Sequence, residues 1–369
     1  MIVKDIVSFL TTIAPAALQE DYDNAGLITG NENWECKGVI ISLDATEEVI
    51  KDAIEKKCNL VIAHHPIIFK GLKKINGKNY VEQTITAAIK NDIAIYSIHT
   101  NLDNVLHGVN GKIADMLGLV KRRTLSPKKQ LLQKLAVFVP LKEKQGVLDA
   151  LFAAGAGNIG NYSDCSFSTE GDGTFQAGPG TNPYVGNQGD RHLEKEVKVE
   201  VIFPGWLQAP ILKAMRAAHP YEEIAYDIYN LENMYTQTGS GLVGDLPEAL
   251  SETDLLQNLQ ALFKIPAIKH TAVTGKTIKK VALCGGAGSF LTGAAIGAGA
   301  DIYITADIKY HEFFDAEGKL LLADIGHYES EQFTIDLLFD LLRDKFPNFA
   351  VLKTGINTNP VHYFTRMAH

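Results

Sequence analysis

The sequence lacks long apolar runs and any excess of positive charge. No stretch approaches the roughly 18–20 apolar residues that a membrane-spanning helix needs, and the first residues, with Lys4 beside Asp5, do not resemble a secretory signal. The 43 acidic residues outnumber the 35 basic ones, for a net charge of −8. We therefore expect no general affinity for nucleic acids or anionic lipids, and a cytoplasmic protein with no membrane association.

Cysteine is also scarce, with four in 369 residues and none in a CxxC pair. This number is too small for a disulfide scaffold and fits a reducing compartment. Cys58 and Cys284 lie in or beside apolar runs, and we expect them to be buried thiols.

Two blocks of the chain alternate apolar strands with helices, over residues 38–120 and 279–346. Continuous apolar strands between helices are typical of parallel or mixed sheets covered on both faces. Within the second block, residues 330–346 predict one long amphipathic helix. A chain of this length predicts two or three domains.

The two blocks align with each other without a gap, so that Val39 and Ile41 match Val281 and Leu283. Further along, at a changed offset, His99-x3-Asp103 matches His327-x3-Glu331, and each motif follows an apolar strand. Any two βαβ units share apolar positions, but that does not explain a His-x3-carboxylate motif in both. The pattern predicts two related α/β halves that share one site.

The middle of the chain differs in composition. Residues 155–189 contain nine glycines and three charged residues, so we expect a mobile or irregular loop there. The flanking segments have the order β-α-β-β-α-β, which is typical of a ferredoxin-like α+β domain. We therefore predict an α/β fold whose two halves form one mixed-sheet core domain, residues 1–127 plus 237–369, with the ferredoxin-like domain inserted at residues 128–236.

Five side chains at the predicted strand and helix ends form a candidate metal site: His64, His65, Asp103, His327 and Glu331. Adjacent histidines at a strand end can point to opposite sides, and residues 327 and 331 share one helix face. Five groups exceed the three protein ligands of a catalytic zinc. They suit two divalent ions about 3.5–4 Å apart, bridged by Glu331 or water. The ligand types do not distinguish zinc, iron, manganese and cobalt.

Other residues are weaker candidates. His99 is a candidate second-sphere group or proton carrier, and Asp44 and His311 are either further site residues or structural hydrogen-bonding groups. The glycine-rich turn 284–289 could hold an anion or allow close packing. At residues 219–223, a packing corner with an exposed acidic pair is the favoured interpretation.

Several blocks resemble one known family, the GTP cyclohydrolase 1 type 2 homologues, also described as a dinuclear-metal hexameric family. The resemblance covers essentially the whole chain in family order. It is carried by DYDNAGL (21–27), AHHPIIF (63–69), SIHTNLD (97–103), LCGGAGSFL (283–291), ITADIKYHEFFDA (304–316) and DIGHYESE (324–331).

The resemblance implies that His64, His65, Asp103, His327 and Glu331 are the metal ligands. It also implies a toroidal homohexamer whose metal sites face an internal cavity, with an insert similar to the PII and CutA proteins. The family name reflects ring-opening hydrolysis of GTP, although no basic cluster flanks the ligands here. We expect a metal-dependent hydrolase of a nucleotide or related small molecule. The alternative is a hexameric metal-binding or regulatory scaffold whose insert senses an effector.

Overall fold

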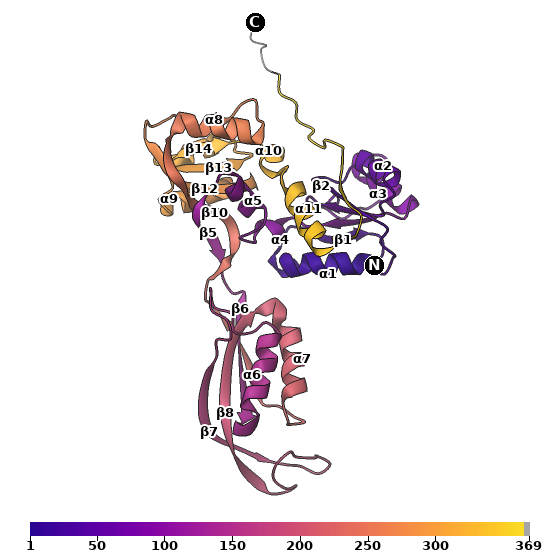
Figure 1. Cartoon of the computed structure of the whole chain (residues 1–369), viewed down its shortest axis with the longest axis vertical. Coiled ribbons are helices and arrows are strands. Elements are labelled where there is room, and N and C mark those ends of the chain that lie inside the picture. The colour runs from indigo at the N-terminus through magenta and orange to yellow at the C-terminus, as the bar shows by residue number, and fades with distance from the viewer. Residues whose placement is uncertain (365–369) are drawn as a thin grey trace. The chain divides into compact units, whose positions relative to one another are not determined.

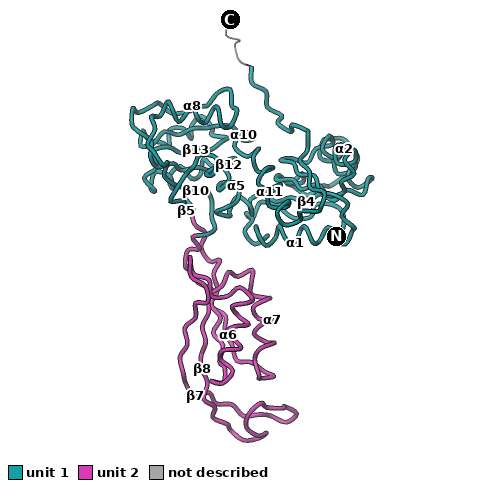
Figure 2. The backbone as a smooth tube through the Cα atoms, viewed as in Figure 1, with its two compact units in different colours: residues 1–126, 237–369 teal, residues 127–236 magenta. Residues whose placement is uncertain are grey.

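The computed structural model describes residues 1–364 and contains three β-sheets (Figure 1). Its internal contacts divide the chain into two compact units, coloured separately in Figure 2. Unit 1 comprises Met1–Ser126 and Gln237–His369, and unit 2 comprises Pro127–Thr236. No helix within residues 1–364 has the length and apolar character needed to cross a bilayer.

The first sheet of unit 1 has five strands in the order β1-β4-β3-β2-β15. All neighbours are parallel except the edge strand β1, which is antiparallel to β4. The elements of this half are α1 (Val3–Ile13), η1 (Ala16–Leu18), β1 (Gly26–Thr29), β2 (Val39–Ser42), α2 (Glu47–Glu55), β3 (Leu60–Ala63), α3 (Tyr80–Lys90), β4 (Ala94–Ser97), α4 (Thr100–Asp103), α5 (Val109–Met116) and, from the far end of the chain, β15 (Val351–Lys353).

The second sheet of unit 1 has six strands in the order β11-β14-β13-β12-β10-β5. Strands β12, β13 and β14 are parallel, and β11 is an antiparallel edge beside β14. The elements of this half are β5 (Val120–Lys128), β10 (Tyr235–Ser251), α8 (Glu252–Phe263), β11 (Lys269–His270), β12 (Thr277–Ala287), η4 (Ser289–Leu291), α9 (Thr292–Gly297), β13 (Ile302–Ala306), η5 (Tyr310–Ala316), β14 (Leu321–Asp324), α10 (His327–Glu331) and α11 (Thr334–Lys345).

The internal repeat predicted from the sequence is present in the sheet register. Val39 pairs with Leu60 across β2 and β3, and its counterpart Val281 pairs with Ile302 across β12 and β13. The parallel strands β2, β3 and β4 therefore correspond to β12, β13 and β14. Each trio carries a short antiparallel edge strand on the same side.

Alternation along these strands explains how the two sheets share one core. Val39 and Ile41 on β2, like Val281 and Leu283 on β12, join a common hydrophobic cluster with α1, α5, α8 and α11. Residues of the opposite parity pack outward, as Ile40 does beneath α2 and α3. Because one core lies against the inner face of both sheets, the strand ends of the two halves are held near each other.

One detail of the α-helical prediction needs correction. The segment 330–346 forms two helices, α10 and α11, which are separated at Gln332–Phe333. The apolar face of α11 is used within the subunit, because Leu338 and Leu342 are fully buried in the common core.

Unit 2 has the predicted β-α-β-β-α-β order. Its antiparallel sheet has the strand order β7-β8-β6-β9, which is the ferredoxin-like arrangement, and α6 and α7 share one core with it. The elements are β6 (Leu132–Pro140), η2 (Leu141–Glu143), α6 (Lys144–Ala153), β7 (Phe167–Gln176), β8 (Arg191–Pro204), η3 (Gly205–Leu207), α7 (Gln208–Ala218) and β9 (Tyr226–Leu231).

The expectation of a mobile or irregular loop over 155–189 is wrong for its central part. Residues Phe167–Gln176 form β7, which pairs with β8 in regular register from Phe167–Glu200 to Gln176–Arg191. Gly171 and Gly173 lie within this strand. Glycine weakens a strand locally, but every residue of β7 pairs with β8, which compensates for this loss.

We predict that unit 2 can be removed without unfolding unit 1, because each unit has its own hydrophobic clusters. A variant in which a short linker replaces residues 128–236 should be soluble and should unfold cooperatively in a thermal melt followed by circular dichroism. Residues 128–236 expressed alone should also melt cooperatively. An insoluble core, obtained with several linker lengths, would show that the insert is integral to the fold.

Candidate metal centre

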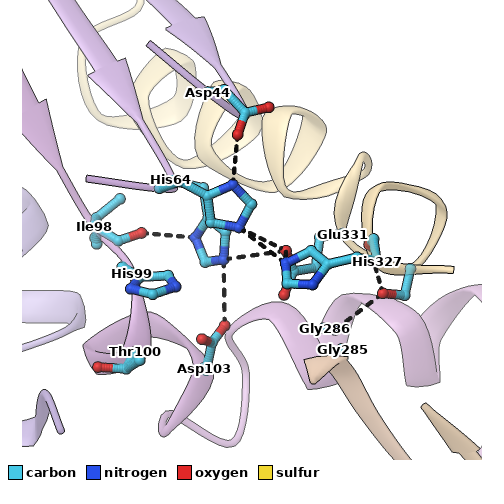
Figure 3. Close-up of polar contacts among 12 residues, drawn as sticks. Asp44, His64, Ile98, His99, Thr100, Asp103, Gly285, Gly286, His327 and Glu331 are labelled. Carbon is cyan, nitrogen blue, oxygen red and sulfur yellow. Dashed lines mark hydrogen bonds and ion pairs between the residues drawn. The ribbon is translucent and has the colours of Figure 1, made fainter. Parts of the chain in front are cut away.

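The five predicted ligands converge from both halves of unit 1. Figure 3 labels four of them, His64, Asp103, His327 and Glu331. His64 and His65 follow β3 directly, and Asp103 ends the short helix α4 after β4. From the second half, His327 and Glu331 are the first and last residues of α10 after β14. One residue separates β4 from His99 and two separate β14 from His327, so the connection in the second half is one residue longer.

The buried carboxylate of Glu331 is the meeting point of the cluster. Its Oε2 lies 2.9 Å from His65 Nε2 and 3.1 Å from His327 Nε2. The two Nε2 atoms are 3.3 Å apart. A carboxylate oxygen and two imidazole nitrogens at this spacing form a group that could hold a divalent ion.

A second group shares Glu331 with His64 and Asp103. His64 Nε2 lies 3.5 Å from Asp103 Oδ1 and 3.9 Å from Glu331 Oε2. Both His64 Nε2 and Asp103 Oδ1 are buried without a hydrogen-bond partner. Orphaned buried polar atoms are costly, and a cation between these two atoms would satisfy both.

Each of the three histidines uses its other ring nitrogen for a fixed protein contact. Nδ1 of His64 lies 2.7 Å from the Ile98 carbonyl oxygen. Nδ1 of His65 lies 2.7 Å from Asp44 Oδ1, and Nδ1 of His327 lies 2.7 Å from Asp307 Oδ2. Metal-binding histidines are oriented in this way by carbonyl and carboxylate groups. The contacts direct all three Nε2 atoms into the centre, so the residues fit a metal site.

The pKa shifts around Glu331 reflect mutual compensation of charge. Burial opposes protonation of both His65 and His327. Hydrogen bonds to Asp44 and Glu331 nevertheless raise the pKa of His65 to about 10. Hydrogen bonds to Glu331 and Asp307 likewise raise the pKa of His327 to about 9. Although burial favours the neutral acid, the same two histidines hold the pKa of Glu331 well below its usual range. Protons on the imidazoles thus balance this carboxylate, a role that a bound cation would take over.

The second group is electrically different. Burial lowers the pKa of His64 to about 3, and burial together with the charge of Glu331 raises the pKa of Asp103 well above its usual range. Both shifts favour the uncharged form of the side chain. A divalent ion would stabilise the ionised form of Asp103 and use the neutral imidazole of His64.

The glycine-rich turn 284–289 serves close packing. A Cβ at Gly286 would lie 2.3 Å from Glu331 Oε1, and this residue has a positive φ of 63°. Its N–H donates to Ser330 Oγ at 3.0 Å, and the N–H of Gly285 donates to Asn110 Oδ1 at 2.9 Å. Of the two interpretations left open by the sequence, the structure favours packing, because these N–H groups already have protein partners.

The structure gives the weaker candidates different roles. His99 lines the same cavity as the cluster, and its Nδ1 lies 2.8 Å from Asp23 Oδ1. Despite the opposing effect of burial, His99 and Thr100 lower the pKa of Asp23 to about 2. Asp44 orients His65. His311 lies in η5, stacked edge-on against Tyr310, outside the described groups of possible ligands.

Three residues of the site were not identified from the sequence: Asp23, Asp307 and Thr358. Asp307 follows β13 as His65 follows β3, so the internal repeat carried a signal for it. Asp23 lies in one of the blocks quoted for the family resemblance. Thr358 donates from Oγ1 to Asp44 Oδ2 at 2.5 Å, a contact across 314 residues that has no local signal.

The centre opens into a cavity of about 560 Å³. Aromatic side chains line the cavity, and Tyr22, Phe69 and Phe290 are more than half exposed. Four carboxylates line it as well, from Glu20, Asp44, Asp103 and Glu331, whereas no lysine or arginine within residues 1–364 does so. The cavity therefore offers flat apolar walls and negative charge around the histidines.

Comparison with known proteins agrees with this arrangement. The Duf34/NIF3 family (NGG1p interacting factor 3) matches residues 1–360. The GTP cyclohydrolase 1 type 2 homologs of Halalkalibacterium halodurans and Bacillus subtilis are 37% and 36% identical, with 97% of each chain covered in both comparisons.

Among solved structures, a Bacillus cereus protein related to NIF3 superposes with a TM-score of 0.87 at 36% identity, covering 99% of both chains. A Staphylococcus aureus protein, SA1388, superposes with a TM-score of 0.78 at 29% identity, again over 99% of both. The match to the family extends over both units and includes every residue of the His, Asp and Glu cluster. The chain belongs to the Duf34/NIF3 family, and its curated relatives carry the name GTP cyclohydrolase 1 type 2 homolog.

Proposed function

We propose that this protein is a dinuclear metal-dependent hydrolase of a small ring-containing molecule. One ion would be held by His65, His327 and Glu331 and the other by His64, Asp103 and Glu331. The observation that carries the proposal is that the three imidazoles are held in the same way. Each commits Nδ1 to a protein oxygen and presents Nε2 to the same buried carboxylate.

When bound, such a pair of ions lowers the pKa of coordinated water toward about 7 and thereby provides a nucleophile at neutral pH. The chain supplies the remaining functions. His99, held at Nδ1 by Asp23, is placed to move a proton at Nε2 to or from the substrate, because this contact fixes the orientation of its ring. Its ring centroid lies 5.3 Å from those of both His64 and His65.

The lining of the cavity supports a class of substrate. Exposed rings of Tyr22, Phe69 and Phe290 offer flat surfaces on which a heterocycle can stack. The relatives' name suggests a purine nucleotide. The absence of lysine and arginine from the described lining means that the ions alone would neutralise a polyphosphate, so a nucleobase, nucleoside or short nucleotide fits these walls better than a triphosphate.

Metal content gives the first test. Reconstituted protein should retain about two divalent ions per chain, whereas His64→Ala and His327→Ala should each retain about one or fewer, because each substitution removes a ligand from one of the two groups. Inductively coupled plasma mass spectrometry after desalting measures this number. His311→Ala is the matched control and should retain the full amount. Fewer than one ion per chain in the unsubstituted protein would contradict the dinuclear assignment.

Turnover gives the second test. Metal-loaded protein should hydrolyse at least one member of a panel of purine and pyrimidine bases, nucleosides and nucleotides, followed by liquid chromatography. We expect His99→Gln to lower kcat by about 100-fold with unchanged metal content, because it removes the proton carrier and no proposed ligand. Glu331→Gln should lose both activity and metal. Full metal loading without turnover of any compound would favour a metal-binding or regulatory scaffold instead.

We further propose that the chain assembles into a homohexamer, as the resemblance implies. The tail beyond β15 supports an intermolecular contact, because Val361, Tyr363 and Phe364 are large, apolar and exposed. Apolar side chains gathered on an acidic protein are typical of an interface, and closed symmetry would bury them in every subunit.

Light scattering should give a mass close to six times the chain mass of 40.3 kDa. Replacing both Val361 and Phe364 by serine should shift the distribution toward smaller species, because it removes apolar area from the contact. The matched double substitution Lys73→Ser and Lys74→Ser, on an exposed loop, should leave the mass unchanged. A monomer at micromolar concentration would contradict the assembly.

A further inference from the structure

Unit 2 contains a cavity of about 470 Å³ that takes no part in the metal centre. It lies on the face of the sheet opposite α6 and α7. Alternation along β8 shows this, because Val197 and Val199 are buried in the core with the two helices, whereas Glu196 lies on the other face and lines the cavity. The volume is within the range of sites for small molecules.

Aromatic rings form one side of this cavity. The ring centroid of Tyr221 lies 6.1 Å from that of Phe175 and 6.1 Å from that of Tyr184, with planes inclined by 58° and 52°. All three residues line the cavity. Inclined rings at this spacing form walls around a common space, and an ammonium group placed among them is within the roughly 6 Å over which a ring face attracts a cation.

The polar ends of the two tyrosines are already engaged. Tyr221 donates its hydroxyl to Glu196 Oε1 at 2.9 Å, and Tyr184 donates to Glu143 Oε1 at 3.0 Å. Donation to a carboxylate increases electron density in the ring, which strengthens its attraction for a cation. The hydroxyl groups are thus fixed at the edges of the cavity, and the ring faces remain for a ligand.

The charge in the cavity is of one sign. Glu196, Glu222 and Glu223 line it, and no lysine or arginine of the described chain does. Two lysines on either side of Glu196 in β8 bind other carboxylates, Lys195 that of Asp172 and Lys198 that of Glu200. No ion pair within residues 1–364 neutralises Glu196.

The backbone makes room for the Glu196 carboxylate. Gly171 lies opposite Glu196 in the β7–β8 ladder, and a Cβ at the nearby Gly173 would lie 2.0 Å from Glu196 Oε2. A side chain at residue 173 would displace the carboxylate from this position. The glycines that made this segment look irregular in the sequence therefore allow an anionic group to lie flat over the strand at the edge of the cavity.

From this combination of rings and unpaired charge, we propose that unit 2 binds a small organic cation, with a quaternary or protonated amine held between the rings of Phe175, Tyr184 and Tyr221 and balanced by Glu196. Carboxylates alone would suit a metal ion as well. The three rings favour an alkylated ammonium group, because its weak hydration and apolar surface suit aromatic walls.

The probe pair is choline and its uncharged isostere 3,3-dimethylbutan-1-ol, which has nearly the same shape. Isothermal titration calorimetry with the full-length, metal-loaded protein should detect choline binding with a Kd of about 1 mM or tighter. The uncharged isostere should bind at least about tenfold more weakly, because it lacks the charge that the rings and Glu196 recognise. Using metal-loaded protein keeps the probe from the acidic metal centre.

Variants locate the site. Glu196→Gln, which keeps an acceptor for the Tyr221 hydroxyl, and Phe175→Leu should each weaken choline binding by about tenfold or more. Glu200→Gln is the matched control, because Glu200 lies on the same strand and face but bonds to Lys198 outside the cavity. It should bind choline like the unsubstituted protein. Circular dichroism melts verify that each variant is folded.

Three outcomes would overturn the proposal. The first is no binding of choline, tetramethylammonium or benzyltrimethylammonium at concentrations up to tens of millimolar. The second is equal binding of choline and its uncharged isostere, which would make the cavity simply apolar. The third is choline binding that Glu196→Gln and Phe175→Leu leave unchanged, which would place the cation elsewhere on the protein.

Discussion

The structure of unit 1 depends on one buried carboxylate. Glu331 is 3% exposed and has three imidazole Nε2 atoms around it, two of which come from the opposite half. An isolated ionised carboxylate at such a depth would cost several kcal/mol. The cost is offset only when the end of β3 and helix α10 bring the histidines next to Glu331. The shared core and the chemistry of the site therefore require the same placement of one half against the other. Gly286 completes this arrangement by leaving space for the carboxylate.

The two halves contribute to the centre in similar but not identical ways. In each, a carboxylate that follows a neighbouring strand orients a histidine, Asp44 for His65 and Asp307 for His327. The first half also supplies a pair of adjacent histidines, which divides the cluster into two groups around Glu331. An internal repeat therefore produces an asymmetric centre, in which His65 and His327 carry protons that balance Glu331, whereas burial favours the uncharged forms of His64 and Asp103.

Sequence reasoning found the parts of this site that carry a local pattern. Adjacent histidines at a strand end and a His-x3-Glu pair on a helix are visible without a structure, and so is the repeat that relates them. Asp23 and Thr358 carry no local pattern, because their partners lie 76 and 314 residues away. An acidic loop residue such as Asp23 resembles any turn former, even within a block that carries the family resemblance. The full extent of strand β7 was not predicted, because its glycines suggest a loop, whereas pairing with β8 determines its conformation. The break between α10 and α11 contains no helix-breaking residue from which it could be predicted.

The sequence separation of the ligands has a consequence for biosynthesis. His65 and Glu331 are 266 residues apart. At about 5–20 residues per second, roughly ten seconds to one minute passes between synthesis of the first histidine pair and of the carboxylate that they surround. Throughout this interval the early half carries some of the candidate ligands but no complete cluster. If the cluster binds the proposed ions, selective binding would therefore follow translation of the second half, and until then the histidine pair would be open to any ion that binds it.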